Sequence, residues 1–141
     1  MVKYIVKNAW KTSEDLLKIT WIEGDVMAAE KQFENKIKKF LDEQGCYYIK
    51  HFANAFTKVG VPDLLCCVNG YFVAVEVKAS NGKPSELQLH NIKKINASGG
   101  FGVVLYPDQF EDFKKMVRCL MEFDKCCASV IRTKINERWF G

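Results

Sequence analysis

Residues 60–79 read GVPDLLCCVNGYFVAVEVKA, and the turn at their centre determines how the whole segment is arranged. Asn69-Gly70 between two apolar, β-branched runs is the strongest short-range signal for a β-hairpin, because both residues tolerate the positive φ angles of a type I′ turn. A two-residue loop pairs Val68 with Tyr71. Counting outward from that pair predicts the next cross-strand neighbours: Cys67 with Phe72, Leu65 with Ala74, and Asp63 with Glu76.

The hairpin brings three charged side chains to one face of the predicted sheet. Cross-strand neighbours share a face, with Cβ atoms roughly 4.5–5.5 Å apart, so Asp63 and Glu76 are expected side by side. Lys78 lies two residues beyond Glu76 and points the same way, about 7 Å along the strand. The opposite face is predicted to be core, formed by Leu64, Cys66, Val68, Tyr71, Val73, Val75 and Val77.

Two opposed carboxylates at the partly dry edge of a sheet repel each other. Either one carboxyl keeps a proton, or a cation lies between Asp63 and Glu76. Their oxygens suit a hard divalent ion such as Mg²⁺ or Mn²⁺. A purely structural ion pair with Lys78 is the alternative interpretation, but it gives no reason for Asp63.

Helical and β patterns alternate on both sides of the hairpin. Apolar residues recur at three- and four-residue spacing from Asp25 until Gly45, which predicts a helix there. Other patterns predict a β-prone run at 46–52, a loop at 53–60, an N-capped helix at 84–100, a buried strand at 101–106 and an amphipathic helix at 109–123. Residues 1–24 and 124–141 show no clear period. One mixed sheet with helices packed on its faces follows, which is an α/β fold.

The bulk properties suit one globular domain: 141 residues, of which 48% are hydrophobic. Apolar runs too short for a membrane span and the lack of a secretory signal make a cytoplasmic protein the expectation. The six cysteines form no C-x-x-C pair, which disfavours zinc and predicts small buried hydrophobes in a reducing compartment. The net charge of +4 is compatible with nucleic-acid binding and equally with a solvated surface of mixed charge.

The charged hairpin resembles a known nuclease signature. Pro62-Asp63, a hairpin and then Glu76-Val77-Lys78 resemble the PD-(D/E)xK motif. The longer string, from GVPD through EVK to PSELQ and a glycine pair, is similar to the VRR-NUC branch of that superfamily, whose members include small stand-alone phage proteins. The resemblance covers about residues 30–115. It implies a restriction-endonuclease-like core and a host-cytoplasmic location for a phage-encoded member.

The resemblance also implies roles for individual residues. Asp63 and Glu76 would bind Mg²⁺ or Mn²⁺ with help from the backbone carbonyl of Val77. Lys78 would orient or deprotonate the attacking water and offset phosphate charge. Sequence leaves the roles of general base and electrostatic clamp equally open for this lysine.

Two further members of the implied catalytic set have competing interpretations. Gln88 matches the glutamine on the family's helix, which supports the lysine or the substrate, but Ser85-x-x-Gln88 is also a capping box. An acid on the first helix is typical of the family. Glu34 fits best because it borders the predicted buried stripe, and Glu30, one turn earlier, is its rival. Either glutamate could instead be a solvated charge paired with a lysine.

These expectations predict a metal-dependent, structure-selective DNA endonuclease acting on branched DNA such as a Holliday junction or a flap. The lysines expected to contact nucleic acid are Lys50, Lys58 and Lys83, with Lys93 and Lys94 as an extension. A symmetric four-way junction would require a homodimer. Residues 25–123 would form the nuclease domain, residues 1–24 an extension suited to an oligomer contact, and residues 124–141 a second extension. The alternatives are a non-catalytic nucleic-acid-binding module and a structural interaction domain.

Overall fold

The Asn69-Gly70 turn forms as predicted. A computed structural model describes residues 13–140, and in it Asn69 and Gly70 have φ angles of 50° and 83°. The turn joins β2 (Leu64–Val68) to β3 (Tyr71–Val77) in antiparallel pairing. Val68 pairs with Tyr71, Cys67 with Phe72, and Leu65 with Ala74, so the predicted register is confirmed.

The hairpin is the centre of a four-stranded mixed sheet with the order β1-β2-β3-β4. β1 (Tyr47–Lys50) is antiparallel to β2, whereas β4 (Phe101–Leu105) is parallel to β3. The connection between parallel strands must cross the sheet, and α3 (Glu86–Ala97) makes this crossover. The predicted α/β fold with one mixed sheet is confirmed.

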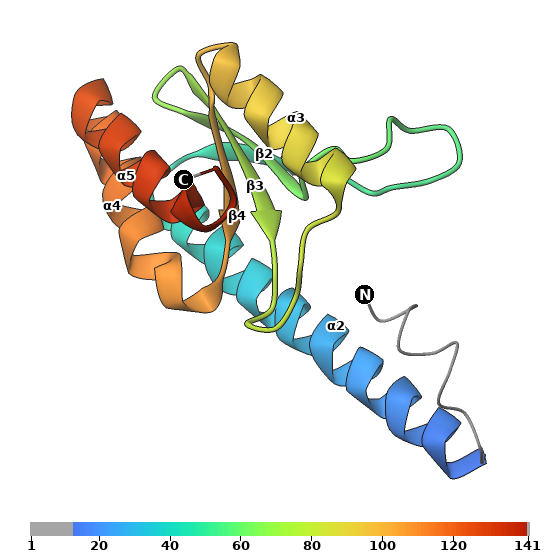
Figure 1. The fold of residues 1–141 in the computed structure, drawn as a ribbon. Helices are drawn as coiled ribbons and strands as arrows, with labels where there is room; N and C mark the ends of the chain where they lie inside the picture. Colours follow the sequence, from blue (N-terminus) through green and yellow to red (C-terminus); the bar gives the residue numbers. More distant parts are fainter. Residues whose placement is uncertain (1–12, 141) are drawn as a thin grey trace.

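Helices cover the two faces of the sheet unequally (Figure 1). α2 (Ser13–Glu43), α4 (Phe110–Met121) and α5 (Lys125–Phe140) contribute buried side chains to the larger core, which contains the alternate strand positions predicted for it. A short 3₁₀ turn, η1 (Pro107–Gln109), precedes α4. α3 packs on the other face, where Ile92 meets Val104 and Tyr106. Glu76 points to this second face, because it alternates with the core residues Val75 and Val77.

The first helix begins at Ser13 rather than at Asp25. Gly24 looked like a boundary because glycine in a helix interior costs about 1 kcal/mol relative to alanine. The segment before it contains leucine, glutamate and lysine, which are good helix formers, so the helix continues through the glycine. Figure 1 shows the first half of α2 extending beyond the rest of the molecule. Residues 1–12, including Trp10, lie outside the described residues.

The C-terminal tail, unassigned from its sequence, is the helix α5, and it contributes Ala128 and Ile135 to the larger core. Its buried Asn136 accepts a hydrogen bond from the Val104 backbone amide (3.2 Å) and donates one to the Gly102 carbonyl (2.8 Å). One side chain thus pairs with two backbone groups of β4, as a neighbouring strand would. A buried polar residue in this role breaks the amphipathic pattern by which helices are found in sequences.

The cysteines are only partly the buried hydrophobes that were expected. Cys46 and Cys66 are buried, but Cys67 and Cys126 are exposed, so the prediction is wrong for those two. Cys67 alternates with Cys66 on β2 and therefore faces the side of the sheet that α3 does not fully cover. The Cys119 thiol lies 3.0 Å from that of Cys127, joining α4 to α5. No helix within residues 13–140 combines the length and apolar character needed to cross a membrane.

Candidate active site

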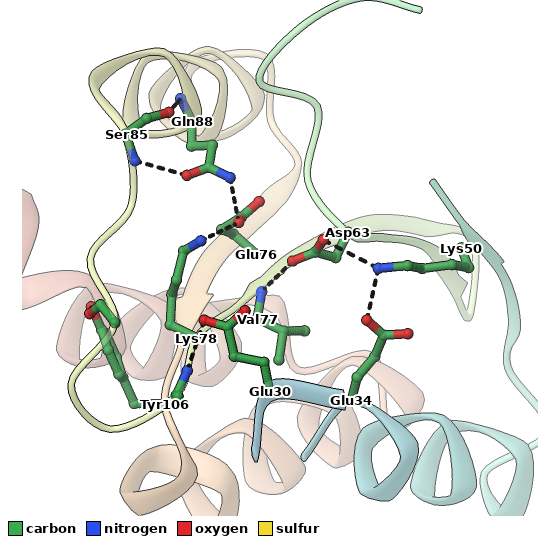
Figure 2. Close-up of polar contacts among 12 residues, drawn as sticks. Glu30, Glu34, Lys50, Asp63, Glu76, Val77, Lys78, Ser85, Gln88 and Tyr106 are labelled. Atoms are coloured by element: carbon green, nitrogen blue, oxygen red, sulfur yellow. Dashed lines mark hydrogen bonds and ion pairs between the residues drawn. The ribbon is translucent and has the colours of Figure 1, made fainter. Parts of the chain in front are cut away.

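The charged end of the hairpin lies between α2 and α3, and it gathers most of the predicted site residues (Figure 2). Asp63 and Glu76 come from the hairpin, and Lys78 follows β3 directly. Gln88 is in the first turn of α3, and Glu34 is on α2. Residues separated by more than fifty positions in the chain therefore meet at one end of the sheet.

Asp63 is positioned by backbone bonds as well as by a lysine. It precedes the first residue of β2, and its carbonyl oxygen accepts a hydrogen bond from the His51 amide (2.8 Å). Its Oδ2 accepts a hydrogen bond from the backbone amide of Val77 (2.8 Å), and its Oδ1 lies 3.2 Å from Lys50 Nζ. The contacts with Val77 and Lys50 fix the carboxylate beside Glu76, and the bond with His51 fixes the backbone of Asp63. Together they give the structural reason for Asp63 that an ion pair with Lys78 alone lacked.

Glu76 is a carboxylate enclosed by protein, with only 1% of its surface exposed. Its Oε1 accepts hydrogen bonds from Gln88 Nε2 (2.6 Å) and forms an ion pair with Lys78 Nζ (3.0 Å). Its Oε2 is buried without a hydrogen-bond partner. Burial and the negative charge of Asp63 raise the pKa of Glu76 to about 7, although the Lys78 ammonium opposes the rise. The site thus holds one carboxylic acid that titrates near neutrality.

Gln88 forms the predicted capping box and also contacts Glu76, whereas its predicted role in supporting the lysine or the substrate stays a prediction. Its backbone amide donates to Ser85 Oγ (3.2 Å), and its Oε1 accepts from the Ser85 amide (2.7 Å), so the capping box is confirmed. The Nε2 of the same side chain donates to Glu76. The cap therefore fixes the side chain that orients the buried carboxylate.

The two candidate acids on α2 have different partners. Glu34 Oε2 lies 2.7 Å from Lys50 Nζ, which itself contacts Asp63, and Glu34 Oε1 lies 2.6 Å from Lys38 Nζ. Burial alone would raise the pKa of Glu34, but the two lysines together lower it. Glu30 instead accepts a hydrogen bond from the Ala79 amide (3.2 Å) and so fastens the turn after β3. Glu34 thus contacts the lysine that pairs with Asp63, whereas Glu30 contacts the backbone, and the choice of Glu34 as the helix acid stays a prediction.

Lys50 occupies a position that its sequence context does not predict. It was expected along a nucleic-acid track, but its ammonium bridges Glu34 and Asp63. Burial lowers the pKa of Lys50, yet the two carboxylates outweigh that effect and raise it. Its location follows from the pairing of β1 with β2, which puts Lys50 opposite Leu64, next to Asp63, and no local sequence signal gives this pairing.

The other two predicted nucleic-acid lysines lie outside this carboxylate group. Lys58 is in the loop between β1 and β2 and lines a cavity of about 370 Å³ together with Lys94 of α3. Lys83 is in the turn that leads into α3. A smaller cavity, of about 160 Å³, opens at the site itself and is lined by Met27, Glu30, Lys31, Glu34, Lys50, Asp63 and Val77.

The donor atoms of the site suit a hard divalent cation. Across residues 13–140, no three His, Cys, Asp or Glu side chains are grouped closely enough to form a metal-binding cluster by themselves. The carboxylates are instead neutralised by Lys50 and Lys78. Carboxylate oxygens are the ligands that Mg²⁺ and Mn²⁺ prefer, and Glu76 Oε2 is a buried oxygen that has no other partner. Asp63 and Glu76 therefore fit such an ion.

Fold and site together define a class of protein. A mixed sheet of restriction-endonuclease type, with an aspartate before one hairpin strand and Glu-x-Lys at the end of the other, is the arrangement of a PD-(D/E)xK-type nuclease. The sequence profile of the family described as archaeal Holliday junction resolvase (Hjc) matches residues 26–100, which is more than half of the 141-residue chain. The chain belongs to this family, and it is accordingly a nuclease that hydrolyses phosphodiester bonds.

The matched segment runs from α2 to the glycine pair before β4 and includes all the predicted site residues. Neither the curated proteins nor the solved structures contain a significant match. The predicted superfamily is thus supported through the Hjc family, whereas the VRR-NUC branch and a phage origin stay predictions.

Proposed function

We propose that the protein is a divalent-metal-dependent endonuclease that recognises the structure of branched DNA, with the four-way Holliday junction as its principal substrate. The observation that carries the proposal is the buried Glu76 carboxylate beside Asp63, with one oxygen unpartnered and Lys78 Nζ 3.0 Å from the other. Burying a carboxylate is costly, and Glu76 has partners for only one of its two oxygens. Buried groups with strongly shifted pKa values are concentrated at functional sites, which supports a catalytic role for Glu76.

The contacts at the site support a separate role for each residue. Asp63 and Glu76, with the Val77 carbonyl, would hold the ion, and Glu34 would be the additional acid at the site. A divalent ion bound there would polarise the scissile phosphate and lower the pKa of an attacking water. Lys78 is placed to orient that water and to offset the charge that builds up on the phosphate. Gln88 positions the Glu76 oxygen that Lys78 also contacts.

The basic groups around the site support a polyanionic substrate. The net charge is +4, and Lys58 and Lys83 are the lysines proposed to contact DNA, whereas Lys50 is engaged by Glu34 and Asp63. Each phosphate contact would release counterions, so affinity should fall as salt rises. The name of the matched family, archaeal Holliday junction resolvase, supports a junction rather than a flap as the preferred form of branched DNA.

We also propose that the protein acts as a homodimer, because resolving a symmetric four-way junction takes two paired active sites. A candidate interface is the open sheet face, which we define as Tyr47, Ile49, Cys67 and Phe72. Tyr47, Cys67 and Phe72 are successive cross-strand neighbours, and Tyr47 is 71% and Phe72 48% exposed. An apolar sheet face open to water supports a protein contact.

The remaining parts of the proposal concern the extent and setting of the nuclease. Residues 25–123 would be the nuclease domain, with residues 1–24 adding an oligomer contact through the protruding half of α2, and residues 124–141 adding α5. Placement in the VRR-NUC branch, a phage-type origin and a cytoplasmic location complete the prediction. Six free cysteines agree with a reducing compartment.

The decisive experiment compares cleavage of labelled four-way junction, flap and linear duplex in Mg²⁺ or Mn²⁺, with EDTA as the metal-free arm. Asp63→Ala and Lys78→Ala should each lower the rate at least about 100-fold, because each removes part of the charge arrangement around the phosphate. Asp112→Ala is the matched control, since Asp112 forms its ion pair with Lys134 on α5.

Cleavage in EDTA, or undiminished cleavage by Asp63→Ala, would contradict the proposed site. If the wild-type protein binds the junction but does not cut it in Mn²⁺, the non-catalytic DNA-binding module is the correct interpretation. If the protein neither binds nor cleaves these DNAs, the structural interaction domain is the correct interpretation.

A further inference from the structure

The loop between β1 and β2 presents a phenylalanine entirely to water. We call residues 51–62 the Phe56 loop. The Phe56 side chain is 99% exposed, and Phe52 and Val59 in the same loop are 74% and 68% exposed. Figure 1 shows the loop reaching out beyond the sheet and α3. Exposed large apolar groups concentrated on one projecting loop indicate a contact with another molecule.

The tip of the Phe56 loop is held in a defined turn. Asn54 Oδ1 accepts a hydrogen bond from the Phe56 amide (2.8 Å), and Thr57 Oγ1 accepts one from the Asn54 amide (2.9 Å). The Thr57 hydroxyl also donates to the Asn54 carbonyl (3.1 Å). Side-chain bonds of this kind stabilise a turn locally, so Phe56 is presented by a preformed turn.

The base of the Phe56 loop is fastened at both ends. At one end the His51 amide donates to the Asp63 carbonyl (2.8 Å). At the other, the Gly60 carbonyl accepts a hydrogen bond from the largely buried Asn91 side chain of α3 (2.9 Å). The loop is therefore a fixed projection from the sheet and α3.

The Phe56 loop begins and ends at the candidate active site. Lys50, which bridges Glu34 and Asp63, precedes it, and Asp63 follows it. Phe56 is seven residues before Asp63, so it lies at most about 23 Å away at the reach of an extended chain. Nucleotides are about 3.4 Å apart along a strand. DNA that places a phosphate at Asp63 thus has bases within the range of Phe56.

The composition of the loop favours nucleic acid over protein as the occupant. The segment HFANAFTKVGVP contains no aspartate or glutamate and includes Lys58, which lines the 370 Å³ cavity with Lys94. An exposed aromatic ring two residues from a lysine suits a base with its adjoining phosphate, because bases stack on aromatic side chains while lysines contact the backbone.

We propose that Phe56 stacks on a base exposed at the branch point of DNA bound in the active site, and that Lys58 contacts a neighbouring phosphate. The inference rests on the proposed function, because it needs branched DNA at that site. A fully paired duplex has its internal base faces covered by stacking, whereas a branch point interrupts the stack. Phe56 is thereby a residue that determines selectivity for branched over linear DNA.

The test measures binding in EDTA, so that neither metal nor cleavage enters the result. Affinities for a four-way junction and for a linear duplex of the same sequence are compared for wild type, Phe56→Ala and Phe56→Trp. Phe123→Ala is the matched control, because Phe123 is also exposed (73%) but lies in the turn between α4 and α5. Phe56→Ala should weaken junction binding about 10- to 100-fold and duplex binding less than about 3-fold. Phe56→Trp and Phe123→Ala should bind like wild type.

Several outcomes would overturn the inference. One is Phe56→Ala with unchanged junction affinity, and another is equal weakening for junction and duplex. A third is a lower molar mass of Phe56→Ala in light scattering, which would place Phe56 in a contact between two copies of the chain.

The melting temperature of Phe56→Ala should match that of wild type, because the Phe56 side chain is exposed. Lys58→Ala should weaken binding to both DNAs and reduce the salt slope by about 1.

These results separate the inference from the proposed function. Junction-selective binding that depends on Phe56, in a protein that does not cut in Mn²⁺, supports the inference and refutes the endonuclease. Metal-dependent junction cleavage by wild type, together with unchanged junction binding by Phe56→Ala, supports the endonuclease and refutes the inference.

Discussion

The carboxylate of Glu76 shows how one residue acquires its properties from its neighbours. Alternation along β3 was sufficient to predict that Glu76 shares a face with Lys78, and the register set by the Asn69-Gly70 turn predicted that it lies beside Asp63. The ion pair with Lys78 agrees with this geometry. Lys50 was assigned to a surface track instead, because its proximity to Asp63 depends on how β1 pairs with β2. Local periodicity gives no information about that pairing.

The raised pKa of Glu76 predicts an unusual pH dependence of stability. Between its ordinary value of 4.5 and about 7, the folded protein keeps a proton that the unfolded chain has lost. The free energy of unfolding should therefore fall as pH rises through this window, and the drop is complete above the folded pKa. Relative to Glu76→Gln, which cannot ionise, wild type should lose about 3 kcal/mol between pH 4.5 and 8.

Urea unfolding in EDTA at several pH values measures this difference. Glu137→Gln on α5 serves as a surface control and should keep the wild-type profile. Parallel pH profiles for wild type and Glu76→Gln would show that Glu76 titrates normally in the folded protein.

The contact between the Phe56 loop and α3 shows how separate elements cooperate to place a site residue. Gly60 has a φ of 79°, and its carbonyl accepts a hydrogen bond from Asn91 of α3. A Cβ at this position would lie 2.7 Å from both Asn91 Nδ2 and Leu87 Cγ, and 3.0 Å from the Leu87 carbonyl carbon. The loop can approach α3 this closely only through a glycine, and Asp63 follows three residues later.

Gly60→Ala should therefore destabilise the fold and also impair the site. Gly70→Ala is the matched control, because Gly70 has a similar φ of 83° but nothing within 4 Å of an added Cβ. Gly70→Ala should cost about 1–2 kcal/mol, the price of a left-handed alanine, and leave junction cleavage intact. Gly60→Ala should cost clearly more and lower cleavage, as measured by thermal unfolding and junction assays. Equal effects of the two substitutions would refute the role of the close approach.

At the scale of the whole molecule, two features point outward from the folded body. The first half of α2 extends away from it (Figure 1), and the open sheet face exposes apolar side chains on β1, β2 and β3. By contrast, the Asn136 side chain of α5 forms hydrogen bonds with two backbone groups of β4. Because α5 packs on β4 and the open sheet face is exposed, the proposed dimer contact is expected at that face.

Light scattering should accordingly give about twice the 16.2 kDa mass of one chain. Ile49→Lys and Phe72→Lys should shift the protein toward monomer, because each places a charge in the open sheet face. Val130→Lys is the control, since Val130 is 66% exposed on α5. A monomeric wild type, or a dimer unaffected by both open-face substitutions, would contradict this interface.

Much of this protein follows from local sequence alone. The Asn69-Gly70 turn sets the hairpin register, and strand alternation then determines which side chains face the core and which form the charged cluster. The capping box at Ser85 and Gln88 marks the start of α3 in the same way. These features depend on residues close together in the chain, so they can be predicted from the sequence.

Tertiary structure decided what depends on contacts between distant segments. These are the bridge of Lys50 between Glu34 and Asp63, the bond of Glu30 to the Ala79 amide, the burial that raises the pKa of Glu76, and the packing of α5 through Asn136 against β4. Each arises because long-range packing sets the distance and the solvation of a side chain. Neither quantity is encoded in the periodicity of the segment that carries the residue.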